Sequence, residues 1–363
     1  MTQVDQTSNH YEVLQRKVAD KLCRDGIAPG GRLPSERELA EFFNVSYLTL
    51  RRAISEMVDR GILERRPRSG TYLRPEGYRR LNNQSVMLVV TGYDSELAKR
   101  FISLGVEEAQ KLQWVPHVVH MDRIQERIVI QALTSGEPAL LLSAPDAMTP
   151  DLMVAVKQAQ GRAVLIGNRM DAMGIPSVVA DDAHGIRMAM EYLQQHGHKH
   201  IAIVGSEPNY SIDQLQLSTW EKCLNLPGVD LSQYILPVNS DRFSSPLDNA
   251  YEAMTHWLKH RPRCISAMLC VVDEMLPAVN RAVIDYGMSI PQDISLVGFG
   301  NTAVSRYANP SVTSVDPHLA EHVEKGMGLL QRALKDPTSV NRNVLIQIEP
   351  ELVQRESVCV ARV

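Results

Sequence analysis

A group of side chains near the N-terminus could make specific contacts with DNA. The stretch NVSYLTLRRAI covers residues 44–54, and it exposes Tyr47 and Leu48 at the start of a predicted helix, with Arg51 and Arg52 one turn further along. An arginine guanidinium can donate two hydrogen bonds to O6 and N7 of guanine, and a helix in the major groove contacts bases with its N-terminal turns. The alternative is that the arginines are solvated surface groups and that Tyr47 and Leu48 pack against a neighbouring helix.

Two further helices are predicted before this one. Residues 11–24 place apolar side chains at helical spacing, and Pro29-Gly30-Gly31 follows the end of that segment. The sequence Ser35-Glu36-Arg37-Glu38 is a capping box, because the Ser35 hydroxyl can accept from the Glu38 backbone N–H while the Glu38 carboxylate reaches back. We therefore expect a second, short helix over residues 35–43.

The candidate DNA-contacting helix completes a helix-turn-helix. Asn44-Val45 predicts a tight turn, Ser46 can cap a third helix that runs to Arg60, and Gly61 ends it. Residues 62–66 and 71–73 then predict two short strands around a turn, which together form a wing. The side chains expected to face inward from the first and third helices are Val13 or Leu14, Val18, Leu22, Leu50, Ile54, Met57 and Val58.

Charge is distributed unevenly along the chain. Residues 1–80 hold 15 Lys and Arg against 11 Asp and Glu, whereas the rest of the chain holds 23 against 31. A basic N-terminal part ahead of an acidic remainder favours a polyanionic partner such as DNA for the former.

The N-terminal residues resemble a known family. The stretch APGGRLPSERELAEFFNVSYLTLRRAISEMVDRGILERRPRSGTYL (residues 28–73) is similar to the winged helix-turn-helix domain of the gluconate-repressor (GntR) family of bacterial regulators, which bind two-fold-related operator half-sites as dimers. The resemblance implies that Arg37 contacts the phosphate backbone or groove edge, that Arg51 lies on the recognition helix and that Ser69-Gly70 enters the minor groove. The family usually has arginine where this chain has Tyr47. The predicted DNA-binding residues are Arg37, Ser46, Tyr47, Thr49, Arg51, Arg52, Arg68, Ser69 and Gly70.

The rest of the chain alternates apolar runs with amphipathic segments. Short buried strands alternating with helices predict parallel sheets with helices on both faces, and the length predicts two α/β lobes. Residues 75–85 lack periodicity and predict a linker, so the expected domains are 1–74, a winged helix-turn-helix, and 86–363, a two-lobed effector-binding and dimerisation domain. The expected strands are 86–90, 115–119, 139–143, 163–167, 200–205, 267–272 and 294–300, and the expected helices are 95–112, 149–160, 182–196, 214–225, 247–260 and 274–286.

Polar side chains that follow the predicted strands mark a ligand cleft. In open α/β sheets, ligands bind beyond the carboxyl ends of the strands. The candidates under this rule are Tyr93, Asp94, Ser143, Asn168, Arg169, Asp273 and Asn301.

A second resemblance supports this cleft. Residues 175–206 and 267–317 are similar to the effector-binding domain of the lactose/galactose-repressor family, itself similar to periplasmic sugar-binding proteins: bilobed, dimeric domains that close on a small ligand, usually a sugar. The resemblance adds Gln216 and Phe243 to the candidate ligand-binding residues. Gln216 stands where relatives tend to hold a sugar-binding arginine, Val272-Asp273 replaces an Asn-Asp pair, and Gly300 replaces an aspartate.

Several other kinds of function are not favoured. The N-terminus MTQVDQTSNHYEV has neither a charged start nor an apolar block, and no run of about 18 apolar residues occurs, so a cytoplasmic location is expected. Five cysteines without a C-x-x-C pair favour buried thiols. His196, His198 and His200 could ligate a metal, but they straddle a predicted helix end and strand start, so no metal or cofactor is expected. No phosphate-binding loop, dinucleotide fingerprint or nucleophile triad occurs, and no enzymatic activity is predicted.

Together these features predict a DNA-binding transcriptional regulator. A gluconate-repressor-type head on a lactose-repressor-type body resembles the layout of the arabinose-responsive repressors. We expect a homodimeric repressor whose affinity for operator DNA changes when a sugar or sugar derivative binds between the lobes. The alternative is a regulator of the same architecture that responds to a non-sugar metabolite or acts without an effector.

Overall fold

A computed structural model gives the structure of the chain and divides it into two compact units, the first made of Met1–Gln84 with the short segment Gln113–Val115 and the second of the remaining residues. The first unit is called the head and the second the body. The structure describes residues 14–15, 17–19, 21–22, 25, 27, 30–67, 69–74, 85–91, 95–121, 125–143, 148–159, 161–205, 211–238, 247–336 and 343–362, without the side chains of 211–213. Most of the predicted linker lies outside the described residues.

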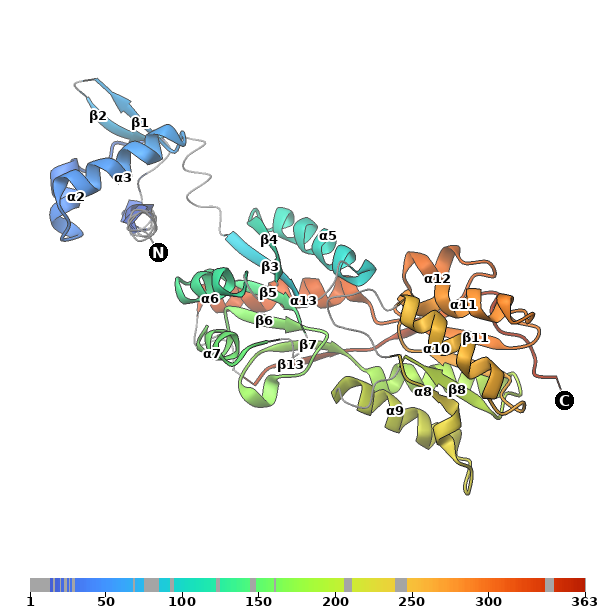
Figure 1. The fold of residues 1–363 in the computed structure, drawn as a ribbon. Coiled ribbons are helices and arrows are strands. Elements are labelled where there is room, and N and C mark those ends of the chain that lie inside the picture. The colour runs from blue at the N-terminus through green and yellow to red at the C-terminus, as the bar shows by residue number, and fades with distance from the viewer. Residues whose placement is uncertain are drawn as a thin grey trace. The chain divides into compact units, whose positions relative to one another are not determined.

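The head is a winged helix-turn-helix, as predicted (Figure 1). The described residues between 14 and 22 are helical, and α2 (Glu36–Phe42), α3 (Tyr47–Asp59), β1 (Leu63–Arg66) and β2 (Gly70–Leu73) follow. Ser35 forms the predicted capping box with Glu38, and Asn44 adopts a left-handed φ of 51° in the turn before α3. The apolar core of the head consists of Leu14, Val18, Leu22, Leu33, Leu39, Ala40, Leu50, Ala53, Ile54, Met57, Leu63 and Leu73.

The N-terminal lobe of the body contains a six-stranded sheet in the order β13-β7-β6-β5-β3-β4. The register pairs residues of β3, β5, β6, β7 and β13 in parallel. Helices α6 and α7 cover one face, while α5 and α13 cover the other, where Gly105 and Gly326 allow close approach to Leu88 and Leu140. The strands are β3 (Ser85–Thr91), β4 (Val115–Met121), β5 (Ala139–Leu142), β6 (Ala163–Ile166), β7 (Ser177–Ala180) and β13 (Leu345–Ile348), and the helices are α5 (Glu96–Lys111), α6 (Glu126–Thr134), α7 (Pro150–Gln158) and α13 (Leu319–Lys335).

The C-terminal lobe contains a second six-stranded sheet in the order β14-β12-β11-β10-β8-β9. All pairings are parallel except that between β12 and β14. The strands are β8 (Ile201–Val204), β9 (Ile235–Leu236), β10 (Ala267–Cys270), β11 (Ser295–Phe299), β12 (Thr313–Asp316) and β14 (Glu351–Val353), and the helices are α8 (Asp182–Gln195), α9 (Ser211–Leu224), α10 (Leu247–His260), α11 (Leu276–Asp285) and α12 (Ala303–Tyr307). Short 3-10 turns lie at Asp171–Met173, Leu231–Tyr234 and Asp273–Met275.

The chain passes between the lobes three times. It leaves the N-terminal lobe between β7 and α8, returns between β12 and α13, and leaves again between β13 and β14. The backbone N–H of Asp181 donates to the carbonyl of Ile348 at 2.8 Å, so two of these crossings lie side by side. Three adjacent connections allow the lobes to move relative to each other while remaining one unit.

The predicted fold class is confirmed, with the lobes built from parallel strands and flanking helices. Every predicted strand and helix of the body is present, but α6, β7, β9 and the elements after residue 300 were not predicted. The expectation of buried thiols is wrong for Cys264, which is exposed. Within the described part of the chain, no helix has the length and apolar character needed to span a membrane.

Candidate functional site

The start of α3 is held by its own hydroxyl groups. The Ser46 Oγ accepts from the backbone N–H of Thr49 at 3.1 Å and lies 2.7 Å from the Thr49 Oγ1. Ser46 satisfies one of the free N–H groups of the helix end in this way, and the two hydroxyls bind each other. Both predicted DNA-contacting side chains are therefore already engaged in positioning the helix.

The exposed face of α3 carries the side chains that remain available. Leu50 and Ile54 are buried in the head core, whereas 74% of Leu48 and 41% of Tyr47 is exposed. Packing of Tyr47 and Leu48 against a neighbouring helix, the alternative considered from the sequence, leaves most of Leu48 uncovered. An exposed apolar side chain on the first turn is suited to contact with a thymine methyl group.

The arginines of the helix-turn-helix differ in their partners. The Arg52 Nε lies 3.6 Å from Glu56 Oε1, one turn further along α3. The Arg51 guanidinium instead lies 6.0 Å from the centre of the Tyr47 ring. Within the described residues, neither Arg51 nor Arg37 forms an ion pair. These two arginines therefore offer uncompensated positive charge at the surface.

The wing is a two-stranded hairpin with hydrogen bonds and a ring contact on both sides of its turn. Leu63 pairs with Leu73 and Arg66 with Gly70, while the Ser69 backbone N–H donates to the Arg66 carbonyl at 3.0 Å. The hydroxyls of Ser69 and Tyr72 lie 2.5 Å apart, and Arg66 stacks 4.2 Å above the Tyr72 ring. Gly70 has a φ of +117°, a conformation that favours glycine. Arg68, also predicted to contact DNA, lies outside the described residues.

In the N-terminal lobe, the carboxyl ends of neighbouring strands bring candidate residues together. The Thr91 hydroxyl at the end of β3 donates to the Ser143 Oγ at 3.0 Å, and the Asn168 Nδ2 donates to the Ser143 carbonyl at 3.3 Å. Arg169 points away into an exposed pair with Asp171 at 3.4 Å. Tyr93 and Asp94 lie outside the described residues. Ser143 and Asn168 thus form a polar edge, to which the structure adds Thr91.

Asp273 in the C-terminal lobe is a buried carboxylate bound by its own lobe. Its Oδ2 accepts from the Thr302 backbone N–H at 2.9 Å and from its hydroxyl at 3.4 Å, and its two oxygens lie 3.0 and 3.1 Å from the Ser314 Oγ. Burial raises the pKa of the Asp273 carboxyl, although these hydrogen bonds oppose the shift. A carboxylate bound in this way joins the segments that follow β10 and β11 to a residue within β12.

Asn301 is likewise held by its own lobe. Its side chain donates to the Asp316 carboxylate at 2.7 Å and accepts from the Arg355 guanidinium, and its backbone adopts a left-handed φ of 44°. Gln216 on α9 is only 5% exposed and has no hydrogen-bond partner among the described residues. Phe243 lies outside the described residues. Of the C-terminal candidates, Gln216 therefore retains the most unused hydrogen-bonding capacity.

The partners of Asp273 were not among the residues predicted from the sequence. These partners are Thr302, which follows β11 and caps α12, and Ser314, which lies within β12. The three histidines of HGHKH have separate partners: His196 binds the Tyr192 carbonyl, His198 lies between Ser266 and the Cys359 carbonyl, and His200 binds Tyr234. Each of the three histidines therefore uses its ring nitrogens for hydrogen bonds within the C-terminal lobe.

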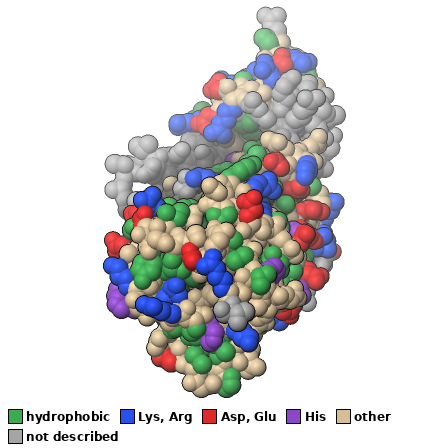
Figure 2. Space-filling model, turned by 90° about the vertical axis from the view of Figure 1, so that its right-hand side faces the viewer, with side chains coloured by type: hydrophobic (Ala, Val, Ile, Leu, Met, Phe, Trp, Pro, Cys, Tyr) green, Lys and Arg blue, Asp and Glu red, His purple; other side chains and the backbone are tan. Residues whose placement is uncertain are grey.

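Figure 2 shows a face of the molecule on which acidic and basic side chains are interspersed with small hydrophobic patches. This mixture offers no extended basic surface there. Arg37 and Arg51, which form no ion pair with any described residue, are the candidates on the head for contacts with a polyanion.

Comparisons with known proteins agree with this division of the chain. Residues 10–73 match the gntR family of bacterial regulatory proteins, and residues 190–358 match the periplasmic binding protein-like domain. The chain is a transcriptional regulator with a GntR-type head and a periplasmic-binding-protein-like body.

Relatives of this regulator include known repressors. The regulator is 23% identical to the arabinose metabolism transcriptional repressor of Geobacillus stearothermophilus, over 97% of this chain and 98% of that protein. It is 27% identical to the HTH-type transcriptional regulator GalR of Escherichia coli, over 66% of this chain and 67% of that protein.

Solved structures match the fold of the regulator's body. A LacI family transcriptional regulator from Enterococcus faecium with bound ribose has 18% sequence identity and a TM-score of 0.65, covering 77% of this chain and all of that one. A regulator of the same family from Weissella paramesenteroides with bound sucrose has 20% identity and a TM-score of 0.62, over 77% of this chain and all of that one.

Proposed function

We propose that the protein is a homodimeric, cytoplasmic repressor whose affinity for operator DNA is changed by a sugar or sugar derivative bound between the lobes of the body. The observation that carries this proposal is the surface of α3, where Leu48 and Arg51 are exposed on a capped helix that a two-stranded wing follows. A helix of this kind is suited to the major groove, with the wing on the adjacent backbone or minor groove.

The partners of each side chain divide the predicted DNA-binding residues into two roles. Arg37 and Arg51, which lack ion-pair partners in the described chain, are proposed to contact phosphates and bases. Tyr47 and Leu48 are proposed to add contacts at the same groove. Ser46 and Thr49 are proposed to position the helix, because each hydroxyl is already bound to the other.

The effector is proposed to bind at the polar edges of the two lobes. Asn168, whose amide is held by the Ser143 carbonyl, supplies its side-chain carbonyl from the N-terminal lobe, and Gln216 supplies an unused amide from the C-terminal lobe. Neutral groups of this kind match the hydroxyls of a sugar. The names of the relatives, which include an arabinose repressor and regulators with bound ribose or sucrose, support the same class of ligand. The proposed action is binding without catalysis.

A second copy of the chain is proposed to cover an apolar groove of the C-terminal lobe. The groove holds about 400 Å³ between α11 and α12, and its lining includes Leu276, Ile284, Val304 and Tyr307. Tyr307 is 79% exposed. In Figure 1, α5 of the N-terminal lobe lies along the same side of the body as α12, and Leu97 on α5 is also exposed. A surface that spans both lobes would transmit a change in their closure to the partner.

Effector and operator would then be linked through the dimer. If the two ligands favour different arrangements of the lobes, each lowers the affinity of the protein for the other by the same factor, a coupling of typically about 1–3 kcal/mol. In corepression, each ligand would instead raise the affinity of the protein for the other by the same factor.

A gel-shift experiment tests the proposal. The protein is titrated onto its own upstream DNA at one stated salt concentration, with and without arabinose, ribose, glucose and sucrose, because phosphate contacts make affinity strongly salt-dependent. We expect a gel shift whose midpoint protein concentration changes with at least one sugar. If no shift occurs at low salt, the proposal that the protein binds this DNA is refuted. If the midpoint is the same with every sugar, the proposal of an effector from this panel is refuted.

A further inference from the structure

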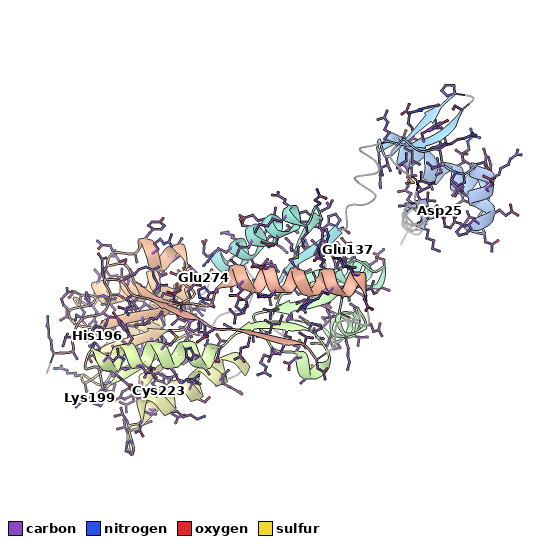
Figure 3. All side chains as sticks on the ribbon, turned by 180° about the vertical axis from the view of Figure 1, so that it is seen from behind. Asp25, Glu137, His196, Lys199, Cys223 and Glu274 are labelled. Carbon is purple, nitrogen blue, oxygen red and sulfur yellow. The ribbon has the colours of Figure 1, made fainter. Side chains whose placement is uncertain are left out.

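The first turn of α5 joins the two lobes through two contacts. The backbone N–H of Glu96 donates to the carboxylate of Glu274, and the Arg100 Nη1 donates to the carbonyls of Gly300 and Asn301 at 3.3 and 3.2 Å. Glu96 and Arg100 are four residues apart, so they lie on one face of α5. Figure 3 shows Glu274 at the border of the lobes, beside the end of α5.

These contacts fall on the loops that would face a ligand. Glu274 follows β10 and Gly300 follows β11, and these strands are neighbours in the C-terminal sheet. Helix α5 begins a few residues after β3, at the carboxyl edge of the N-terminal sheet. The first turn of α5 therefore connects the two strand edges between which ligands bind in bilobed α/β domains.

The loop that receives Arg100 is held in place by its own lobe. Asp273 binds the backbone and hydroxyl of Thr302, while the side chain of Asn301 binds Asp316 and Arg355. The two carbonyl acceptors are consequently fixed before Arg100 reaches them. On the other side, a carboxylate at the N-terminus of a 16-residue helix is favoured by the helix dipole.

We propose that Glu274 and Arg100 form a latch that holds the lobes together at this edge of the cleft without a bound effector. The two contacts act as a unit, because both depend on the same placement of α5 against the C-terminal lobe. The consequence for regulation rests on the proposed function: an effector would bind a cleft whose closure the latch has already favoured, and loss of the latch would weaken the apparent affinity of an effector that needs the closed form.

Amide hydrogen exchange on the full-length protein, without DNA or sugar, tests the latch. The variants are Arg100→Ala and Glu274→Ala, with Arg127→Ala and Glu252→Ala as controls, since Arg127 and Glu252 are exposed on α6 and α10. We expect the Glu96 amide to exchange about tenfold faster or more in both latch variants and in neither control. The Ala98 amide, which donates to the Oγ of the N-cap residue Ser95 at 3.0 Å, should keep its exchange rate.

The informative variant is Arg100→Ala, because the Arg100 side chain does not bind the Glu96 amide. Unchanged exchange at Glu96 in this variant would show two independent contacts and overturn the latch. If Arg100→Ala folds poorly by thermal unfolding, Arg100→Lys, which can still reach one carbonyl, should give a smaller acceleration in the same direction. A protein that shows coupled exchange but shifts no DNA would keep the latch and lose the proposed function.

Discussion

Replacement of Asp273 separates a structural role from a ligand-binding one. The Asp273 carboxylate accepts from the fixed backbone N–H of Thr302 and from two hydroxyls that can rotate. In Asp273→Ala the amide loses its acceptor, and a buried unsatisfied donor costs about 1–3 kcal/mol. Adding a partial loss for the hydroxyls, we expect the free energy of unfolding to fall by about 2–4 kcal/mol. In Asp273→Asn the remaining oxygen can still accept, so the expected loss is within about 1 kcal/mol.

The difference in stability between wild type and Asp273→Asn should change with pH in a direction that the pKa of Asp273 fixes. Burial raises the pKa of Asp273 above 3.8 in the folded protein, so the folded state binds this proton more tightly than the unfolded state. The stabilisation from proton binding is complete below pH 3.8 and is lost as pH rises through the raised pKa. Asparagine does not titrate. The Asp273→Asn protein should therefore gain stability relative to wild type as pH rises from about 4 towards 7.

Urea unfolding of wild type, Asp273→Ala and Asp273→Asn at several pH values measures the loss of stability and its pH dependence. Calorimetric titration with a sugar that moves the gel shift measures sugar binding. Asp273→Asn should bind that sugar with an unchanged dissociation constant, since the carboxylate is bound within its own lobe. A large loss of sugar binding in a stable Asp273→Asn protein would refute the structural role. Equal stability of Asp273→Ala and wild type would refute the hydrogen-bond argument.

Four further outcomes are expected. Arg51→Ala should weaken operator binding by about 5- to 150-fold, whereas Arg52→Ala, which removes a residue paired with Glu56, should change it less; equal losses in gel shift would contradict the distinction. Leu48→Ala should reduce the preference for thymine over uracil in the operator, because uracil lacks the methyl group. Tyr47→Arg should alter the base preference measured by selection from random DNA. If the variant selects the same sequence as the wild type, α3 is not the recognition helix. Gly298→Ala should destabilise the body, because an added Cβ would lie 2.2 Å from the Asp273 Oδ1; an unchanged thermal midpoint would show that the carboxylate can move aside.

Much of the head could be predicted because its signals are local. The capping box at Ser35, the turn at Asn44 and the cap at Ser46 all depend on residues within four positions of each other, and the structure contains each of them. The pair of Arg52 with Glu56 is also local and could have been found from its spacing.

The sequence by itself determined the fold class and the order of elements, because apolar periodicity and helix caps act over short distances. Only the tertiary structure decided what the candidate site residues do. Asp273 meets Thr302 and Ser314 across 29 and 41 residues, and Arg100 meets Gly300 across 200. Such contacts depend on which strands are neighbours in the sheet and on three crossings between lobes, which no local pattern encodes. The tertiary structure thus gives the Asp273 carboxylate a structural role within its lobe and places Arg100 of α5 at the edge of the cleft.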